Sequence, residues 1–158
     1  MIIMGIDPGL RFNGYGVVEY QSGNFKHIVN GTFKTNEKLS LAERLSQIYY
    51  GLNDILKTYR PAEVAVEEVF VNVNPASTLK LGQARGVAIL TPSLLGIPVF
   101  EYSPNLIKKS VVGVGHAGKE QIQMMVKLLL SNPVIDSEHS GDALAVAICH
   151  AHNRNSFK

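Results

Sequence analysis

Apolar residues in the opening part of the chain fall into short runs and two-residue alternations, the patterns that β-strands produce. Three segments show this, at 1–6, 15–20 and 25–33. A glycine-containing turn from Pro8 to Asn13 separates the first two segments. Short strands that follow one another through turns predict an antiparallel meander.

The rest of the chain alternates between helical spacing and buried strands. Apolar residues recur every three or four positions from Leu41 to Tyr59, and Pro61 ends that segment. The later elements predicted are a strand at 64–69, a helix at 76–90 before Pro92, a strand at 98–102, and helices near 104–110, 122–129 and 138–152. A meander followed by strand–helix alternation predicts an α/β fold with a mixed central sheet flanked by helices on both faces.

Length and composition predict one domain over residues 1–158, because 158 residues that are 46% hydrophobic can build one sizeable core. No apolar run reaches the roughly 18 residues that cross a bilayer, and the start lacks the pattern of a signal peptide. We therefore expect a cytoplasmic protein without a membrane partner. The single cysteine, Cys149, excludes an intrachain disulfide and is expected to act as a small core residue.

Acidic residues stand at the ends of segments that should be buried. Asp7 closes the first strand, and Asp142 opens a long apolar helical run. An unpaired buried charge costs several kcal/mol, so such groups are normally paired, hydrogen-bonded or bound to metal. Glu67 and Glu68 are neighbours in the fourth strand, where only one can face a given site. His139 precedes Asp142 by three residues and shares roughly its helical face, so the pattern predicts a metal site.

Positive charge is concentrated in the middle of the chain. The net charge is only +2, but the segment 71–119 holds five cations against Glu101 alone. These cations are Lys80, Arg85, Lys108, Lys109 and Lys119. A clustered positive field is typical of proteins that bind polyanions such as nucleic acids, although a run of charges is more often a solvated face.

Four motifs occur in an order that resembles one family. They are GIDPG at 5–9, AVEEVF at 65–70, KLGQARG at 80–86 and SGDALA at 140–145. From about residue 1 to 152 the chain resembles the RuvC-type Holliday-junction resolvases. This resemblance implies an RNase H-like fold, a homodimer, and metal-dependent cleavage of four-way DNA junctions in recombination and repair. It also implies a branch-migration helicase complex as a partner.

The resemblance assigns roles to the candidate residues. Asp7, Glu67 and Asp142 match the catalytic, metal-binding acids of the family, and they would hold two Mg²⁺ per subunit, with Mn²⁺ as a substitute. His139 stands where many members carry aspartate and some carry histidine, so it could bind metal, act as a base or orient water. Phe70 matches a loop aromatic that would stack on bases, although it could equally be a core residue. With Phe70, the expected DNA-binding residues are Lys80, Arg85, Lys108, Lys109 and Lys119.

Other functions compete with this interpretation. Each acid taken alone could be an ordinary turn, salt-bridge or helix-start residue. The loop Gly113–Lys119 fits most of a phosphate-binding motif and would suit a nucleotide-binding hydrolase, but Glu120 stands where that motif needs a hydroxyl. The motif at 5–9 could serve an actin-like kinase, which needs a second lobe that this chain is too short to hold. A non-catalytic junction-binding protein is the third alternative, and the complete set of acids argues against it.

Overall fold

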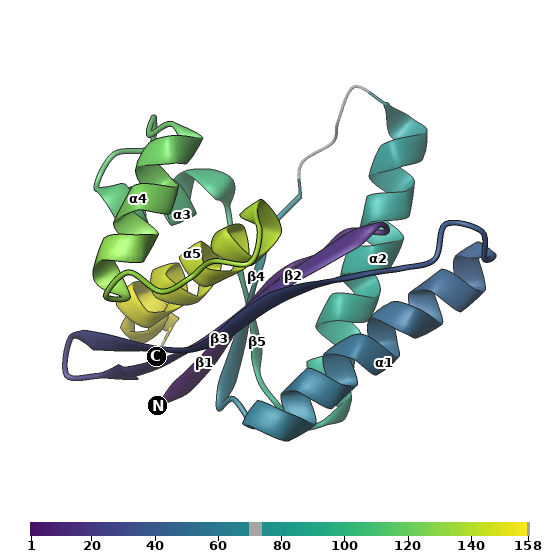
Figure 1. The fold of residues 1–158 in the computed structure, drawn as a ribbon, viewed down its shortest axis with the longest axis horizontal. Coiled ribbons are helices and arrows are strands. Elements are labelled where there is room, and N and C mark those ends of the chain that lie inside the picture. Colours follow the sequence, from purple (N-terminus) through teal and green to yellow (C-terminus); the bar gives the residue numbers. More distant parts are fainter. Residues whose placement is uncertain (70–73, 158) are drawn as a thin grey trace.

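Strand β1 lies at the centre of a five-stranded sheet in the computed structural model, which describes residues 1–69 and 74–157 (Figure 1). The strand order is β3-β2-β1-β4-β5. The strands are β1 (Ile2–Asp7), β2 (Phe12–Gln21), β3 (Asn24–Lys34), β4 (Glu63–Glu67) and β5 (Val99–Tyr102). Strands β1, β2 and β3 pair antiparallel, whereas β1, β4 and β5 pair parallel. The predicted mixed sheet is confirmed.

Helices cover both faces of this sheet, as the sequence predicts (Figure 1). They are α1 (Leu41–Tyr59), α2 (Pro75–Leu94), α3 (Pro104–Val112), α4 (Lys119–Leu129) and α5 (Glu138–Asn153), followed by the 3₁₀ turn Arg154–Phe157. One buried cluster joins the sheet to α1 and α2, and the other joins it to α3, α4 and α5. No helix among the described residues is long and apolar enough to cross a membrane.

Several element boundaries differ from those that the sequence predicts, most clearly those of β2, β4 and α2. Strand β2 already begins at Phe12, within the predicted turn, and β4 ends at Glu67, before Val69. Helix α2 continues through Pro92 to Leu94. A proline in the last turn removes one backbone donor near the helix end, where few hydrogen bonds remain to be lost, so the helix is not broken there.

Helix α5 packs directly against the backbone of the two central strands. A methyl carbon added at Gly5 would lie 1.9 Å from the carbonyl oxygen of Ala143, and one added at Gly14 would lie 2.2 Å from that of His139. Only glycine permits so close a backbone approach. These contacts bring the start of α5 beside the end of β1, which is where Asp7 lies.

A buried polar chain fixes the other end of α5. His150 is fully buried, with Nδ1 2.6 Å from the Tyr102 hydroxyl and Nε2 2.7 Å from a carboxylate oxygen of Glu63. Arg154 donates to both oxygens of the same carboxylate at 3.3 Å. The neighbouring Cys149 is buried, as the sequence predicts. The helix is therefore anchored to the sheet at both ends.

Candidate active site

Asp7 and Glu67 end two neighbouring parallel strands on the same face of the sheet. Strands β1 and β4 are in register with Ile6 opposite Val66, so the next residue of each strand is an acid. Side chains alternate along a strand, and Ile6 and Val66 pack in the cluster beneath α1 and α2. The two acids therefore point to the opposite face, beside α5. Glu68 does not line the cavity described below, as strand alternation predicts.

His139 and Asp142 bring the start of α5 to the same place. The Nδ1 of His139 lies 3.0 Å from Oδ2 of Asp7, close enough for the imidazole to donate a hydrogen bond to the carboxylate. The His139 ring stacks on Phe12 with 5.3 Å between ring centroids. Asp142 follows by three residues, so it lies on the same side of the helix. The structure thus joins acids that are 135 positions apart in the sequence.

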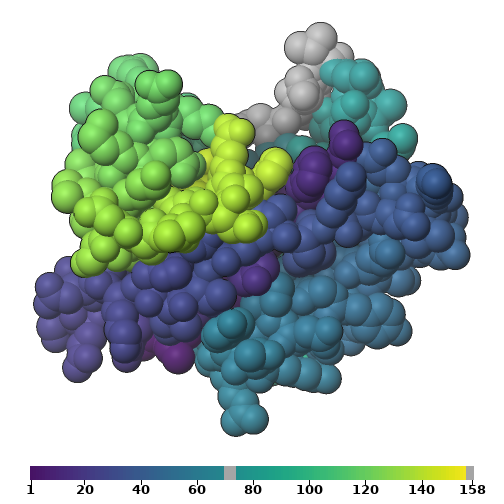
Figure 2. Space-filling model, viewed as in Figure 1, coloured from purple at the N-terminus to yellow at the C-terminus, as the bar shows by residue number. Residues whose placement is uncertain are grey.

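A cavity of about 340 Å³ opens beside these acids, between β4, α3, α4 and α5. Its lining residues include two acids and two cations: Glu67, Asp142, Lys108 and Lys119. Figure 2 shows the surface hollowed between the green α3–α4 segment and the teal α2, with the start of α5 lying between them. Glu67 and Asp142 therefore line a cavity on the surface of the molecule.

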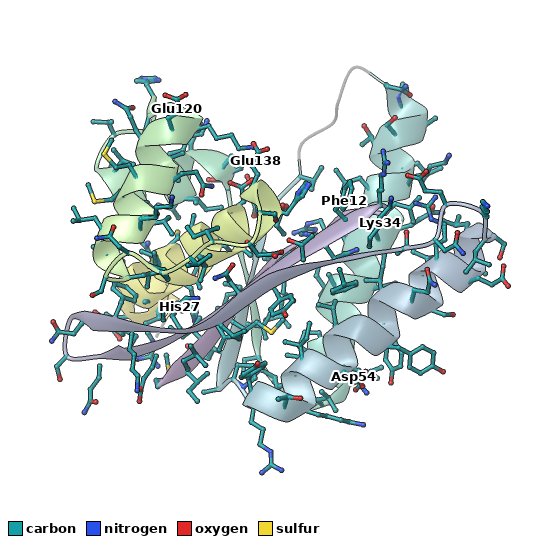
Figure 3. All side chains as sticks on the ribbon, viewed as in Figure 1. Phe12, His27, Lys34, Asp54, Glu120 and Glu138 are labelled. Atoms are coloured by element: carbon teal, nitrogen blue, oxygen red, sulfur yellow. The ribbon has the colours of Figure 1, made fainter. Side chains whose placement is uncertain are left out.

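Two side chains of α4 bind the acids of α5. The ammonium of Lys119 forms an ion pair with Glu138 and lies 3.5 Å from Oδ2 of Asp142. Gln123 donates a hydrogen bond of 3.1 Å to Oδ1 of Asp142. Figure 3 shows Glu138 at the start of α5, facing α4. Asp142 is therefore the best neutralised of the three carboxylates around the site.

Burial makes the carboxylates of the site hard to ionise. It raises the pKa of Glu67 to about 7, and the nearby charges of Asp7 and Asp142 add to that effect. Burial also raises the pKa of Asp7, against the hydrogen bond from His139, and the pKa of Asp142, against the charge of Lys119. Repulsion among partly buried carboxylates is the electrostatic signature of a site for a cation.

The donor chemistry of this site suits a divalent metal ion. Among the residues that the structure describes, no three His, Cys, Asp or Glu side chains converge closely enough to hold one ion. The carboxylates are nonetheless near enough to raise one another's pKa, and oxygen ligands of this kind are those that Mg²⁺ prefers. Asp7, Glu67 and Asp142, with His139 at their edge, are the residues that would hold the metal.

We expect Glu67→Gln to stabilise the metal-free protein at pH 8 and to leave its stability nearly unchanged at pH 5. The folded protein holds a proton on Glu67 more tightly than the unfolded chain does, so this residue's contribution to stability falls as the pH rises from about 4.5 to about 7. The gain at pH 8 should be about 1–2 kcal/mol, because solvent screens a partly exposed carboxylate. Thermal melting in chelator-treated buffer measures it.

Mg²⁺ should reverse the difference in stability between Glu67→Gln and the parent at pH 8. Metal ligands must be deprotonated, so Mg²⁺ should raise the melting temperature of the parent more at pH 8 than at pH 6. Glu67→Gln should lose most of that rise, whereas Glu68→Gln should keep it. An equal rise in all three proteins would contradict metal binding by Glu67.

The structure separates the predicted DNA-binding residues into groups. Lys108 and Lys119 line the cavity, whereas Lys80 lines another pocket and Lys109 is exposed outside the cavity lining. Arg85 forms an ion pair with Glu101, and its guanidinium Nε donates a 3.0 Å hydrogen bond to the carbonyl of Glu67. Because its side chain is only 17% exposed, Arg85 suits a supporting role better than the predicted DNA contact. The prediction for Phe70 lies outside the described residues.

The geometry of the glycine-rich loop does not suit a nucleotide-binding hydrolase. A phosphate-binding loop connects a strand to a helix. Here Gly113 ends α3 with a φ of 91°, and Lys119 begins α4, so the loop connects two helices. Lys119 is also engaged with acids of α5. The loop instead forms one wall of the cavity.

Comparison with known proteins identifies the family. The family model for the crossover junction endodeoxyribonuclease RuvC matches residues 3–150. Proteins of that name from Mesorhizobium japonicum and Rhodospirillum rubrum are 52% and 51% identical to this chain, over 98% of it and 91% of each relative. The structure of Thermus thermophilus RuvC in complex with a Holliday junction substrate superposes with a TM-score of 0.92 at 32% identity, covering 99% of this chain and 96% of that one. The chain therefore belongs to the RuvC family of crossover junction endodeoxyribonucleases, and its fold is RNase H-like.

Proposed function

We propose that this protein resolves Holliday junctions in recombination and DNA repair, by metal-dependent hydrolysis of symmetrically placed phosphodiester bonds. The observation that carries the proposal is that Asp7 and Asp142 lie near enough to Glu67 to help raise its pKa to about 7, in a chain of this family. The solved relative with bound junction substrate supports four-way DNA as the ligand. Residues 1–158 would form one nuclease domain. A branch-migration helicase partner, which the family resemblance implies, and a cytoplasmic location, which the sequence pattern predicts, belong to the same proposal.

The proposed mechanism gives each group of residues one task. Asp7, Glu67, Asp142 and His139 would hold two Mg²⁺ ions, with Mn²⁺ as a substitute. The chemistry that such ions supply when bound is activation of water and neutralisation of the leaving oxygen. Asp7 orients the His139 ring through the 3.0 Å hydrogen bond, which leaves Nε2 available as a ligand or as a proton acceptor. Lys108 and Lys119, on the cavity wall, would position the DNA backbone.

Cleavage of a synthetic four-way junction tests the proposal. With Mg²⁺ present, the purified protein should cut two symmetry-related strands of the junction and leave a linear duplex of the same sequence intact. The nicked products should be ligatable, because the cuts are placed symmetrically. Tight junction binding without cleavage in either Mg²⁺ or Mn²⁺ would favour the non-catalytic junction-binding protein and would contradict the nuclease.

A two-fold dimer would match the symmetry of the junction, and the outward face of α2 is the surface we propose for it. Leu79, Leu90 and Leu94 are 65%, 52% and 63% exposed there. Gly82 and Gly86 lie between them with open space around their α-carbons, so two copies of the helix could approach closely. Sedimentation equilibrium should give a dimer for the parent and a monomer for Leu90→Asp. A dimeric Leu90→Asp variant would exclude this face.

His139 should give the site a measurable tolerance for manganese. Imidazole suits transition metals better than it suits magnesium, so the parent should have a higher Mn²⁺-to-Mg²⁺ ratio of cleavage rates than His139→Asp, by about three- to tenfold. His139→Asp should stay active because it restores a cluster of oxygen ligands. Single-turnover cleavage at one fixed pH measures both rates, since a protonated histidine cannot bind metal.

His139→Ala is the companion variant. It should lose most activity with either ion, because both the hydrogen bond to Asp7 and the ring nitrogens are removed. Parental rates in both metals would exclude any part for His139 in catalysis. An unchanged metal ratio in His139→Asp would exclude metal ligation while leaving a role in proton transfer.

A further inference from the structure

A second pocket, with a volume of about 380 Å³, lies where four parts of the chain meet. These parts are the turn after β1, the segment after β3, the start of α1 and the start of α2. The lining residues are Leu10, Arg11, Glu37, Arg44, Ser77, Lys80 and Leu81. None of them lines the acidic cavity, so this is a separate site on the surface.

Positive charge dominates this second pocket. Its lining holds three cations and one carboxylate: Arg11, Arg44, Lys80 and Glu37. Arg11 forms an ion pair with Glu37, and both side chains are about half exposed. Arg11 binds the Glu37 carboxylate through Nε, and a phosphate oxygen could take the place of that carboxylate oxygen, because guanidinium groups bind both kinds of anion.

Arg44 is held in place before any ligand arrives. Its Nε donates to the hydroxyl of Thr35 at 3.0 Å, and its Nη2 donates to the carbonyl of Leu10 at 3.2 Å. Thr35 is almost fully buried and bonds the same carbonyl. These contacts use two of the five N–H groups of the guanidinium. A donor group fixed in this way loses little conformational entropy when it binds an anion.

The second pocket is connected rigidly to the acidic site. Arg11 follows Asp7 by four residues, so their α-carbons are at most about 14 Å apart. The side chain of Asn13 is fully buried and bonds both the N–H and the carbonyl of Gly9, which fixes the turn between them.

Contacts with the Phe12 ring also connect Arg11 with His139 at the acidic site. The Arg11 guanidinium lies 5.1 Å from the centre of the Phe12 ring, which stacks on His139. Figure 3 shows Phe12 beside Lys34, whose ammonium lies 5.7 Å from the same ring. One more cation thus lies near the path between the two sites.

We propose that this pocket binds a backbone phosphate of the junction strand, a few nucleotides from the bond that is cut. The inference rests on the proposed function and extends it, because it assigns Arg11 and Arg44 to DNA binding beside Lys80. The upper limit of about 14 Å between the α-carbons corresponds to no more than about four nucleotides at 3.4 Å of axial rise each. Glu37 occupies the anion position in the free protein and is displaced by the phosphate when DNA binds.

Junction affinity across a salt series tests the pocket. Asp7→Asn serves as a common background, so that the DNA stays intact during the measurement. Arg11→Gln and Lys80→Gln should each lower the affinity about tenfold and reduce the log–log salt slope by about one unit. Glu37→Gln should raise the affinity severalfold, because it removes the competing carboxylate. The control is Lys57→Gln, an exposed cation in the last turn of α1, which should match the background protein.

Neutral phosphate analogues then locate the contact. Methylphosphonate is substituted for one phosphate at a time along the junction strand. At one position within a few nucleotides of the cut, the substitution should weaken binding to the background protein about as much as Arg11→Gln does. Combining the two changes should add little further loss, because they remove the same contact. Parental salt slopes for Arg11→Gln and Lys80→Gln, or full additivity at every phosphate, would overturn the proposed pocket. Failure of the background protein to bind junctions would instead overturn the proposed function.

Discussion

Asp7→Asn should reduce junction cleavage by about 10³-fold or more while leaving junction binding nearly intact, and Glu67→Gln should do the same. Both changes remove a metal-ligating charge without adding bulk, and loss of a ligand removes the chemistry that the metal supplies. The side-chain amide oxygen that Asp7→Asn introduces can still accept a hydrogen bond from His139, so the fold around the site should persist. Single-turnover cleavage and equilibrium binding to the same junction measure the two effects separately.

Glu68→Gln is the matched control for these variants. Glu68 follows directly after Glu67 but lies outside the cavity lining, and its backbone N–H bonds the carbonyl of Tyr102 at 2.8 Å. The substitution keeps that backbone bond, so we expect a loss of cleavage of less than about threefold. Equal losses at the two glutamates would contradict the assignment of sheet faces. Near-parental cleavage by Asp7→Asn would contradict the whole acidic site.

Gly5→Ala should lower the free energy of unfolding by about 3 kcal/mol or more, which is roughly 10 °C in melting temperature. The added methyl carbon would lie 1.9 Å from the carbonyl oxygen of Ala143 and 2.9 Å from the backbone nitrogen of Ala147. Both neighbours are helix backbone, which cannot turn aside as a flexible side chain can. The helix must therefore move away from β1, which also separates Asp142 from Asp7. Chemical denaturation and cleavage of junctions should both report the change.

Gly115→Ala is the control for the effect of an added methyl group. Nothing lies within 4 Å of the position that its β-carbon would take, and its φ is not in the left-handed region. Its stability should stay within about 0.5 kcal/mol of the parent. If Gly5→Ala melted at the parental temperature, the backbone contact between α5 and β1 would not constrain the fold as we describe.

Much of the fold can be predicted from hydrophobic spacing, because each of the larger elements has a clear period. Helix α1 spans the residues that the pattern predicts, since Ser40 and Glu43 form a capping box at its start and Arg60 ends it in a left-handed conformation. The boundaries that differ depend on tertiary contacts. Phe12 pairs with Lys34 and so extends β2 into a segment whose glycines suggest a turn.

The sequence also predicts acids for the candidate site, because charged residues at the ends of buried segments are costly and therefore informative. For individual cations, the structure adds contacts that the sequence does not indicate. Arg85 belongs to the basic segment of the sequence, yet its partners are Glu101 and the Glu67 carbonyl. The contacts of Gln123 and Arg44 cannot be predicted from the sequence, because an isolated polar residue on a helix belongs to no pattern. Their positions emerge only when distant segments meet.

Arg85 also connects two features of the molecule that would otherwise be independent. It lies on α2, the helix whose outward face we propose for the dimer, and it holds the backbone carbonyl of the strand residue Glu67. Any adjustment of α2 on contact with a second copy would therefore reach the backbone of Glu67, whose carboxylate we propose as a metal ligand. Each subunit would then sense whether its partner is present, and a solitary subunit would be a poor nuclease.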